Sequence, residues 1–136
     1  MRVCLCILAL AISLGAAPSP PAETLRGRLV IAAGHTPALV TADGTEVKLD
    51  GDPDTRKILD DPRLSGFEVD ARGHYTSSDR FAIDPIHTRA ILVHRDGKLM
   101  LITYFCELCN IRAWTPGPCA CCQRETTLEL RDPDEK

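Results

Sequence analysis

Two Cys-x-x-Cys pairs near the C-terminus constrain this chain more than any other feature. Cys106 and Cys109 form the first pair, nine residues follow, and Cys119 and Cys122 form the second pair, with Cys121 inside it. The tight turn of each pair directs two sulfurs at one point. The link ends in Thr-Pro-Gly-Pro, a strong turn signal that would fold the second pair back onto the first. The spacing therefore predicts four thiolates around one tetrahedral metal ion, as in zinc-ribbon or rubredoxin-like clips.

The thiols leave several chemistries open. Zn²⁺ is the predicted ion, and a single Fe ion would suit the same four sulfurs. A Cu(I) site built from Cys119, Cys121 and Cys122 is a further alternative. Structural disulfides with one thiol left over, or catalytic thiol–disulfide exchange at Cys106 and Cys109, are the alternatives without metal. The link is shorter than the one usual between ribbon pairs, and Cys121 leaves the identity of the fourth ligand open.

The first residues are typical of a secretory signal peptide. A basic start at Arg2 precedes an apolar run that ends at small residues, which predicts cleavage after residue 16. An uncleaved membrane anchor is the alternative. Cys4 and Cys6 belong to residues 1–16 and would be lost on export, and residues 17–23 form a proline-rich lead-in. We expect a periplasmic or extracellular protein without a stable membrane span after cleavage.

The charge of the mature chain argues against nucleic acid as a partner. Without Arg2 it has fifteen basic residues against nineteen acidic ones, a net charge of −4. Nucleic-acid binders need a concentrated basic surface. No hydrolase motif or convincing carboxylate pair is present, so a non-enzymatic role is favoured over an enzyme. The sequence indicates no particular protein partner.

Short apolar runs separated by turn residues predict a β-rich domain. Strands are expected over 24–31, 37–41, 46–49, 64–75, 80–84 and 125–131, with a long hairpin over 86–105. Asp96-Gly97 between two apolar runs is the strongest hairpin signal in the chain.

One short helix is expected after the third strand. Asp52 is placed as its N-cap and Pro53 at its first position, and the helix runs on to Asp61, where Pro62 ends it. The alternative is a calcium loop, because acidic residues alternate from Asp50. The sixth position of that loop lacks the required glycine and the twelfth lacks a bidentate glutamate, which favours the helix.

The order of these elements predicts a small OB-like, partly open β-barrel with one short helix and a C-terminal cysteine-rich metal-clip hairpin. We expect one domain over 24–131, which includes a cysteine cap over 104–123, and a charged tail over 132–136. Fold alone does not assign a function.

The hairpin register adds one neighbour to the thiols. A two-residue turn pairs Arg95 with Lys98, and extension of the same ladder brings His87 opposite Cys106. His87 is therefore a candidate hydrogen-bond donor to a ligand sulfur, or a ligand itself. His94 is expected on the surface.

These motifs resemble the C-terminal signature of an uncharacterised family of small exported bacterial proteins. The similar residues are 103–112 and 115–123, with Gly51–Leu64 and Ile86–Arg89 upstream. The resemblance implies secretion and a single unit made of barrel and cysteine cap. It implies no particular activity.

Overall fold

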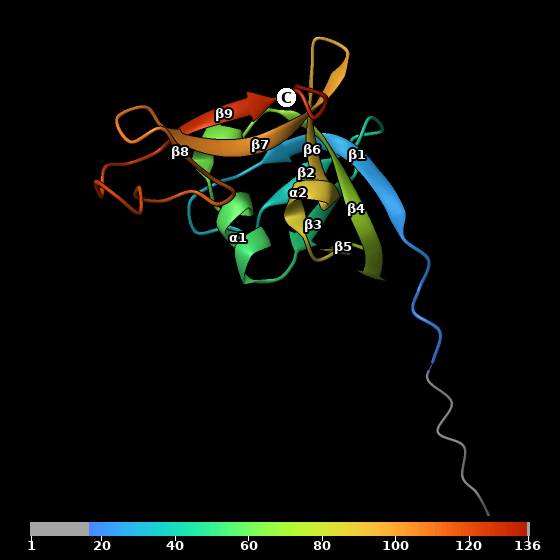
Figure 1. The fold of residues 1–136 in the computed structure, drawn as a ribbon. Helices are drawn as coiled ribbons and strands as arrows, with labels where there is room; N and C mark the ends of the chain where they lie inside the picture. The colour runs from blue at the N-terminus through green and yellow to red at the C-terminus, as the bar shows by residue number, and fades with distance from the viewer. Residues whose placement is uncertain (1–16, 136) are drawn as a thin grey trace, which may run out of the picture.

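A computed structural model describes residues 17–135, and they form a mainly β fold (Figure 1). The elements in chain order are β1 (Glu23–Val30), β2 (Ala38–Val40), β3 (Glu46–Asp50), α1 (Pro53–Leu59), the 3₁₀ helix η1 (Pro62–Leu64), β4 (Glu68–Ser77), β5 (Arg80–Ile83), α2 (His87–Ala90), β6 (Ile91–Arg95), β7 (Lys98–Cys106), β8 (Ile111–Ala113) and β9 (Thr127–Arg131). The predicted signal peptide lies outside the described residues.

The first five strands form a barrel. They follow the order β1-β2-β3-β5-β4, and β4 pairs back onto β1, so the ring is closed rather than partly open. β3 and β5 run parallel and the other pairs of the ring run antiparallel. The single crossover between the parallel strands contains α1 and β4. The predicted OB-like, mainly β architecture is confirmed.

Close packing of the barrel strands explains two of its glycines. A Cβ atom on Gly73 of β4 would lie 2.0 Å from the carbonyl oxygen of Ala82 on β5. One on Gly27 of β1 would lie 2.6 Å from the carbonyl oxygen of Val40 on β2. Both contacts are with backbone, which cannot move aside cheaply. Glycine is therefore needed where these neighbouring strands approach each other most closely.

The helix between the third and fourth strands begins as predicted. The Asp52 carboxylate accepts a hydrogen bond from the Thr55 amide at 2.8 Å, and Pro53 occupies the first turn. Asp50, which the calcium alternative requires as a ligand, pairs instead with Arg56 at 2.9 Å. In both contacts, a carboxylate that would bind calcium is instead paired with a donor group of the protein. α1 turns Ile58 and Leu59 into the barrel core.

The hairpin at Asp96-Gly97 has the predicted register over its first pairs, from Arg95 with Lys98 to Leu92 with Leu101. It does not continue to His87. Residues 87–90 form α2, and the residue before them, Ile86, has the left-handed φ of 71°. The predicted pairing of His87 with Cys106 is wrong because β8 takes that place, with Ile111 opposite Cys106.

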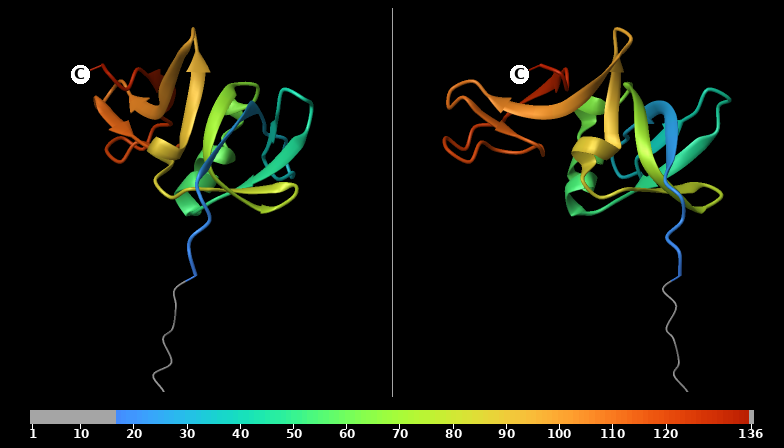
Figure 2. Two further views of the ribbon diagram at one scale, coloured as in Figure 1. Left: turned by 90° about the vertical axis from the view of Figure 1, so that its right-hand side faces the viewer. Right: turned by 45° about the vertical axis from the view of Figure 1, so that its right-hand side comes forward.

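β7 joins the barrel to the cysteine cap. Its first half pairs with β6, which lies beside β4 of the barrel, and its second half pairs with β8 on the same side. β9 runs along its opposite side from Leu101 to Phe105. Both views in Figure 2 show the cap at the far end of β7, on the other side of the molecule from the lead-in before β1.

A partly buried ionic cluster lies on the outer wall of the barrel. His94 Nε2 and Arg26 Nε each lie 2.8 Å from Oδ1 of Asp70. The side chains of His94 and Asp70 are only 20% and 15% exposed. His94 was expected on the surface, but its partner on β4 draws it against the barrel.

Candidate metal centre

The first cysteine turn, which we call the first knuckle (residues 106–110), connects β7 to β8. Cys106 is the last residue of β7, and the amide of Cys109 donates to its sulfur. Asn110 then adopts a left-handed conformation with φ of 54°, and the chain returns at Ile111, opposite Cys106. The turn is therefore a compact loop with its first sulfur directed inward.

The second knuckle (residues 119–123) repeats this conformation. The amide of Cys121 donates to the Cys119 sulfur at 3.4 Å, and the amide of Cys122 also points at that sulfur. Gln123 is left-handed with φ of 59°, and the chain returns at Arg124, whose carbonyl accepts from the Cys119 amide at 2.7 Å. In both knuckles the chain thus returns beside the first cysteine after five residues.

The equivalence of the knuckles shows which cysteine of the second knuckle corresponds to Cys109 of the first. Cys122 takes the position that Cys109 has in the first knuckle, directly before the left-handed residue. Cys121 corresponds instead to Leu108, and both are exposed.

The two knuckles bring four sulfurs into one cluster. The Sγ atoms of Cys106, Cys109, Cys119 and Cys122 all lie within 4.8 Å of one another, and those of Cys106 and Cys122 are 3.6 Å apart. Metal–sulfur bonds of about 2.3 Å in a regular tetrahedron place the sulfurs about 3.8 Å apart. The four cysteines therefore form a group that could bind a metal ion.

Burial and backbone amides shift the pKa values of these thiols in different directions. Cys119 is 2% exposed, and the amides of Cys122 and Cys121 lower the pKa of its thiol to about 7. For Cys106 the Cys109 amide acts in the same direction, but burial and the neighbouring thiols outweigh it and raise the pKa. The Cys121 thiol and burial raise the pKa of Cys109. Of these three thiols, Cys119 is therefore the one whose thiolate form the surrounding backbone amides favour.

His87 contributes to the cap in an unexpected way. Its Nε2 atom lies 2.8 Å from the carbonyl oxygen of Trp114, in the link between the knuckles. The predicted contact with the Cys106 sulfur is replaced by this bond to the backbone. α2 therefore supports the link that joins the two cysteine pairs.

A buried polar network, which the sequence analysis missed, fastens the cap to the barrel. The Asp61 carboxylate accepts from the Tyr104 hydroxyl at 2.9 Å and from Arg63 Nε at 2.9 Å. Arg63 Nη1 also donates to the carbonyl of Thr126 at 2.8 Å, and the Thr126 hydroxyl donates to the carbonyl of Gly117 at 2.8 Å. Asp61 and Tyr104 are 5% and 0% exposed.

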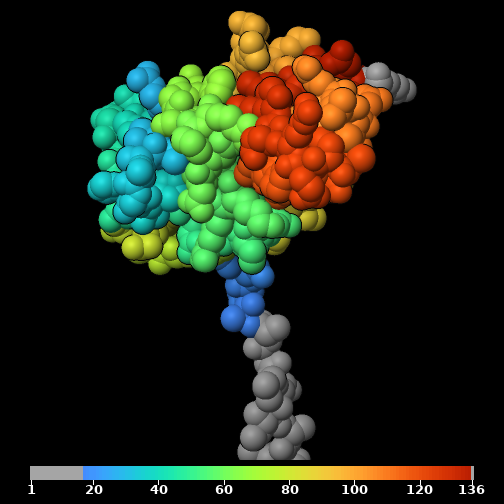
Figure 3. Space-filling model, turned by 90° about the vertical axis from the view of Figure 1, so that its left-hand side faces the viewer, coloured from blue at the N-terminus to red at the C-terminus, as the bar shows by residue number. Residues whose placement is uncertain are grey.

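The network crosses a visible boundary between two parts of the molecule. Figure 3 shows the cap packed against the surface of α1 and η1. Arg63 lies over the Tyr104 ring, 5.2 Å from its centre, so a charge and an aromatic face meet at this boundary. The cap therefore packs against residues that lie far from the knuckles in the sequence.

We expect acid to weaken the fold through Asp61. Burial raises the pKa of this carboxyl, but the hydrogen bonds from Arg63 and Tyr104 outweigh burial and lower it overall. A lowered pKa in the folded state means that the stabilisation is present above the unfolded value of about 3.9 and is lost as the pH falls through the folded value. Urea unfolding of metal-free protein should therefore show a lower midpoint at acid pH, and Asp61→Asn should reduce that drop. Equal drops in both proteins would contradict the prediction.

The left-handed residues of the knuckles allow a stabilising substitution. A side chain at positive φ costs roughly 1–2 kcal/mol, a cost that glycine avoids. Gln123→Gly should therefore raise the free energy of unfolding. We expect a net gain of about 1 kcal/mol, because glycine also gives the unfolded chain more entropy, which offsets part of the relieved strain. Gln123→Val should lower it, because a β-branched residue fits positive φ worst. Urea denaturation with metal bound measures both, and a destabilised Gln123→Gly would contradict the assignment.

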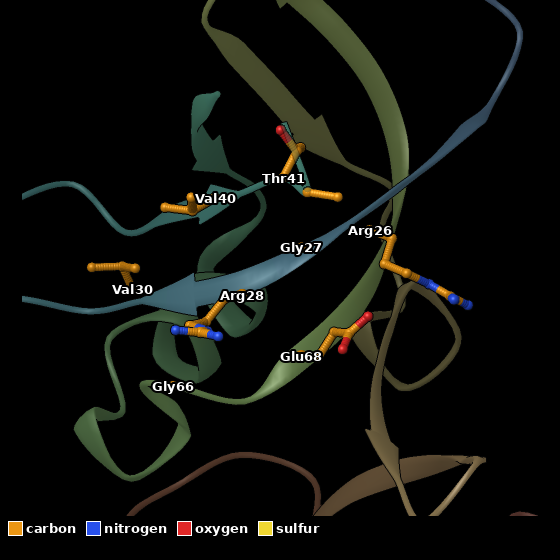
Figure 4. Close-up of a pocket in the computed structure, with 9 residues that line it drawn as sticks. Arg26, Gly27, Arg28, Val30, Val40, Thr41, Gly66 and Glu68 are labelled. Carbon is orange, nitrogen blue, oxygen red and sulfur yellow. The ribbon is translucent and has the colours of Figure 1, made fainter. Parts of the chain in front are cut away.

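A groove over the barrel strands is remote from the cysteines. It has a volume of about 700 Å³ and lies over β1, between the β2–β3 turn and Gly66 (Figure 4). Its two arginines each face an acidic residue of β4, with Arg28 opposite Glu68, which also lines the groove, and Arg26 opposite Asp70. None of the lining residues belongs to the cysteine cap. The groove offers no concentrated charge for a ligand.

Comparisons with protein-family models, with curated proteins and with solved structures gave no match for this chain. Across residues 17–135, no helix has the length and apolar character needed to cross a membrane.

Proposed function

We propose that this protein is an exported, non-enzymatic β-domain whose four clustered cysteines hold one structural zinc ion. The observation that carries the proposal is the mutual approach of the Cys106, Cys109, Cys119 and Cys122 sulfurs within 4.8 Å. Structural zinc sites are closed, with four protein ligands and no free coordination position. Four thiolates meet that requirement without a contribution from solvent.

The position of the site supports a structural role. The first knuckle follows β7 and the second precedes β9, and these strands pair along Leu101–Phe105. An ion held between the knuckles would tie the end of the sheet to the link over α1 and η1. The cap buries only modest apolar surface, since Leu108, Ile111 and Trp114 are exposed. A metal would supply the cohesion that the side chains of the cap lack.

The metal alternatives make different demands on the same residues. Iron would use the same four sulfurs, so only the identity of the bound metal separates an iron site from a zinc site. A Cu(I) site made of Cys119, Cys121 and Cys122 would require Cys121 to face the cluster, and Cys121 is exposed. The described cluster of four favours zinc or iron over this copper site.

The thiol–disulfide alternative has less support. Dithiol exchangers place the attacking cysteine at the start of a helix, where the dipole stabilises the thiolate. The first knuckle leads instead into β8, and the sulfur with the lowered pKa, Cys119, is 2% exposed. Both features suit a metal ligand better than a nucleophile.

Metal analysis of the protein, purified under reducing conditions, tests the proposal. We expect about one equivalent of zinc, no visible colour, and a lower thermal midpoint after a chelator is added. Iron would appear in the elemental analysis and as colour. Metal-free protein whose stability is unaffected by zinc or chelator would overturn the proposal. Export is tested separately by fractionation of cells that express the full chain.

A further inference from the structure

Two sulfurs of the cluster come from opposite knuckles and lie close together. Sγ of Cys106, at the end of β7, is 3.6 Å from Sγ of Cys122 in the second knuckle. A disulfide bond is about 2.0 Å long, so an approach of about 1.5 Å would join the two sulfurs. The two residues are 16 positions apart, so this bond would close a loop that contains the whole link between the knuckles. It would hold the knuckles together as a metal ion does.

The surroundings of this pair give a small oxidant access to it. Cys122 is half-buried, whereas Cys106 is only 4% exposed. A groove with a volume of about 420 Å³ leads from the surface to Cys106. Its lining includes Leu108 of the first knuckle and Arg124, directly after the second knuckle. A molecule as small as hydrogen peroxide therefore has a route to both members of the pair.

We propose that Cys106 and Cys122 form an oxidation site, at which a peroxide converts the pair to a disulfide and releases the bound metal ion. This inference rests on the proposed metal site and adds a way to empty it. The cap would have two staples that exclude each other, the ion under reducing conditions and the Cys106–Cys122 bond under oxidising ones. An exported protein meets oxidising conditions, under which thiols form disulfides.

The reaction consumes one peroxide for each ion released. The Cys122 thiolate attacks one oxygen of hydrogen peroxide, the O–O bond breaks, and Cys122 becomes a sulfenic acid. The Cys106 thiolate then attacks the sulfur of Cys122, which forms the disulfide and expels hydroxide. The pair has given up two electrons, and the peroxide becomes two water molecules after the uptake of two protons. Cys109 and Cys119 each take up a further proton, because two thiolates no longer hold the ion.

Peptide mapping after oxidation tests the proposal, because trypsin separates the two knuckles. Cleavage after Lys98, Arg112 and Arg124 leaves the first knuckle's cysteines in residues 99–112 and the second knuckle's in residues 113–124. Zinc-loaded protein treated with about one equivalent of hydrogen peroxide should release its zinc and lose about two thiols. The two peptides should then be joined, and fragmentation should place the bond between Cys106 and Cys122. Reduction by dithiothreitol with added zinc should restore the starting protein.

The outcomes separate this inference from the proposed function. Cys121→Ser is the matched control, because it removes an exposed thiol outside the cluster of four and should leave zinc release and the joined peptides unchanged. Disulfides within a single peptide, a joined pair that requires Cys121, or zinc retained with its thiols intact would overturn the inference and leave the metal site standing. Protein that binds no zinc before oxidation would overturn the proposed function, and this inference with it.

Discussion

Cys119→Ser should remove the zinc-dependent stability of this protein. The Cys119 sulfur is the most buried of the four, receives two backbone amides, and has a thiol pKa of about 7. An ion at a free concentration 1,000-fold above its Kd stabilises the folded state by about 4 kcal/mol. For a domain of this size that corresponds to a thermal midpoint about 10–20 °C lower in the variant. Differential scanning calorimetry with and without zinc measures the change.

The control for this variant lies in the same turn. Ala120→Ser changes an exposed neighbour of Cys119 and should keep both zinc stoichiometry and the zinc-dependent shift. The barrel has its own core, which includes Leu29, Val47 and Phe81. Cys119→Ser should therefore keep the far-ultraviolet circular dichroism of the folded strands at room temperature. A Cys119→Ser protein that binds one equivalent of zinc with the original midpoint would contradict the assigned ligand set.

Asp61→Ala is expected to destabilise the fold about as severely, by a route that needs no metal. The side chain of Asp61 is 3% exposed and receives bonds from Arg63 and the fully buried Tyr104 hydroxyl. Removal of one partner of a buried ion pair costs about 3–5 kcal/mol, because it leaves the other groups without compensation. We expect the lower end, about 3 kcal/mol, since the Arg63 side chain is 35% exposed and water can reach it.

Urea unfolding of the metal-free protein isolates this effect from zinc binding. Tyr104→Phe, which leaves the Asp61–Arg63 pair in place, should lose roughly 1.5–2 kcal/mol. Asp60→Ala is the matched control, because Asp60 is an exposed acidic neighbour, and its effect should stay within about 0.5 kcal/mol. A loss in Asp61→Ala no greater than in Asp60→Ala would show that the network contributes nothing to stability.

Local signals in the sequence predicted most of the barrel. Asp52 and Pro53 predicted the start of α1, and Asp96-Gly97 predicted the turn between β6 and β7, because each depends on residues a few positions apart. The failure at His87 has a non-local cause. Ile111 occupies the edge of β7 opposite Cys106, and no local pattern reveals which of two segments will pair with one strand.

The cysteine site was likewise predicted from local signals only in part. Spacing predicted two pairs of ligands, but Cys121 and Cys122 could not be separated until the left-handed Gln123 placed Cys122 at the end of the second knuckle. The contact of Asp61 with Tyr104 was missed because the two residues are 43 positions apart. The local sequence around Asp61 predicts only the end of a helix.

The link between the knuckles also gives the protein a natural optical probe. Trp114 is the single tryptophan of the chain, is 46% exposed, and has its carbonyl held by His87. Tyr104, in contrast, is fully buried at the boundary with the barrel. Fluorescence excited selectively at tryptophan therefore reports the cysteine cap, while circular dichroism reports the strands. An opening of the cap that precedes unfolding of the barrel would appear as two separate transitions in unlabelled protein.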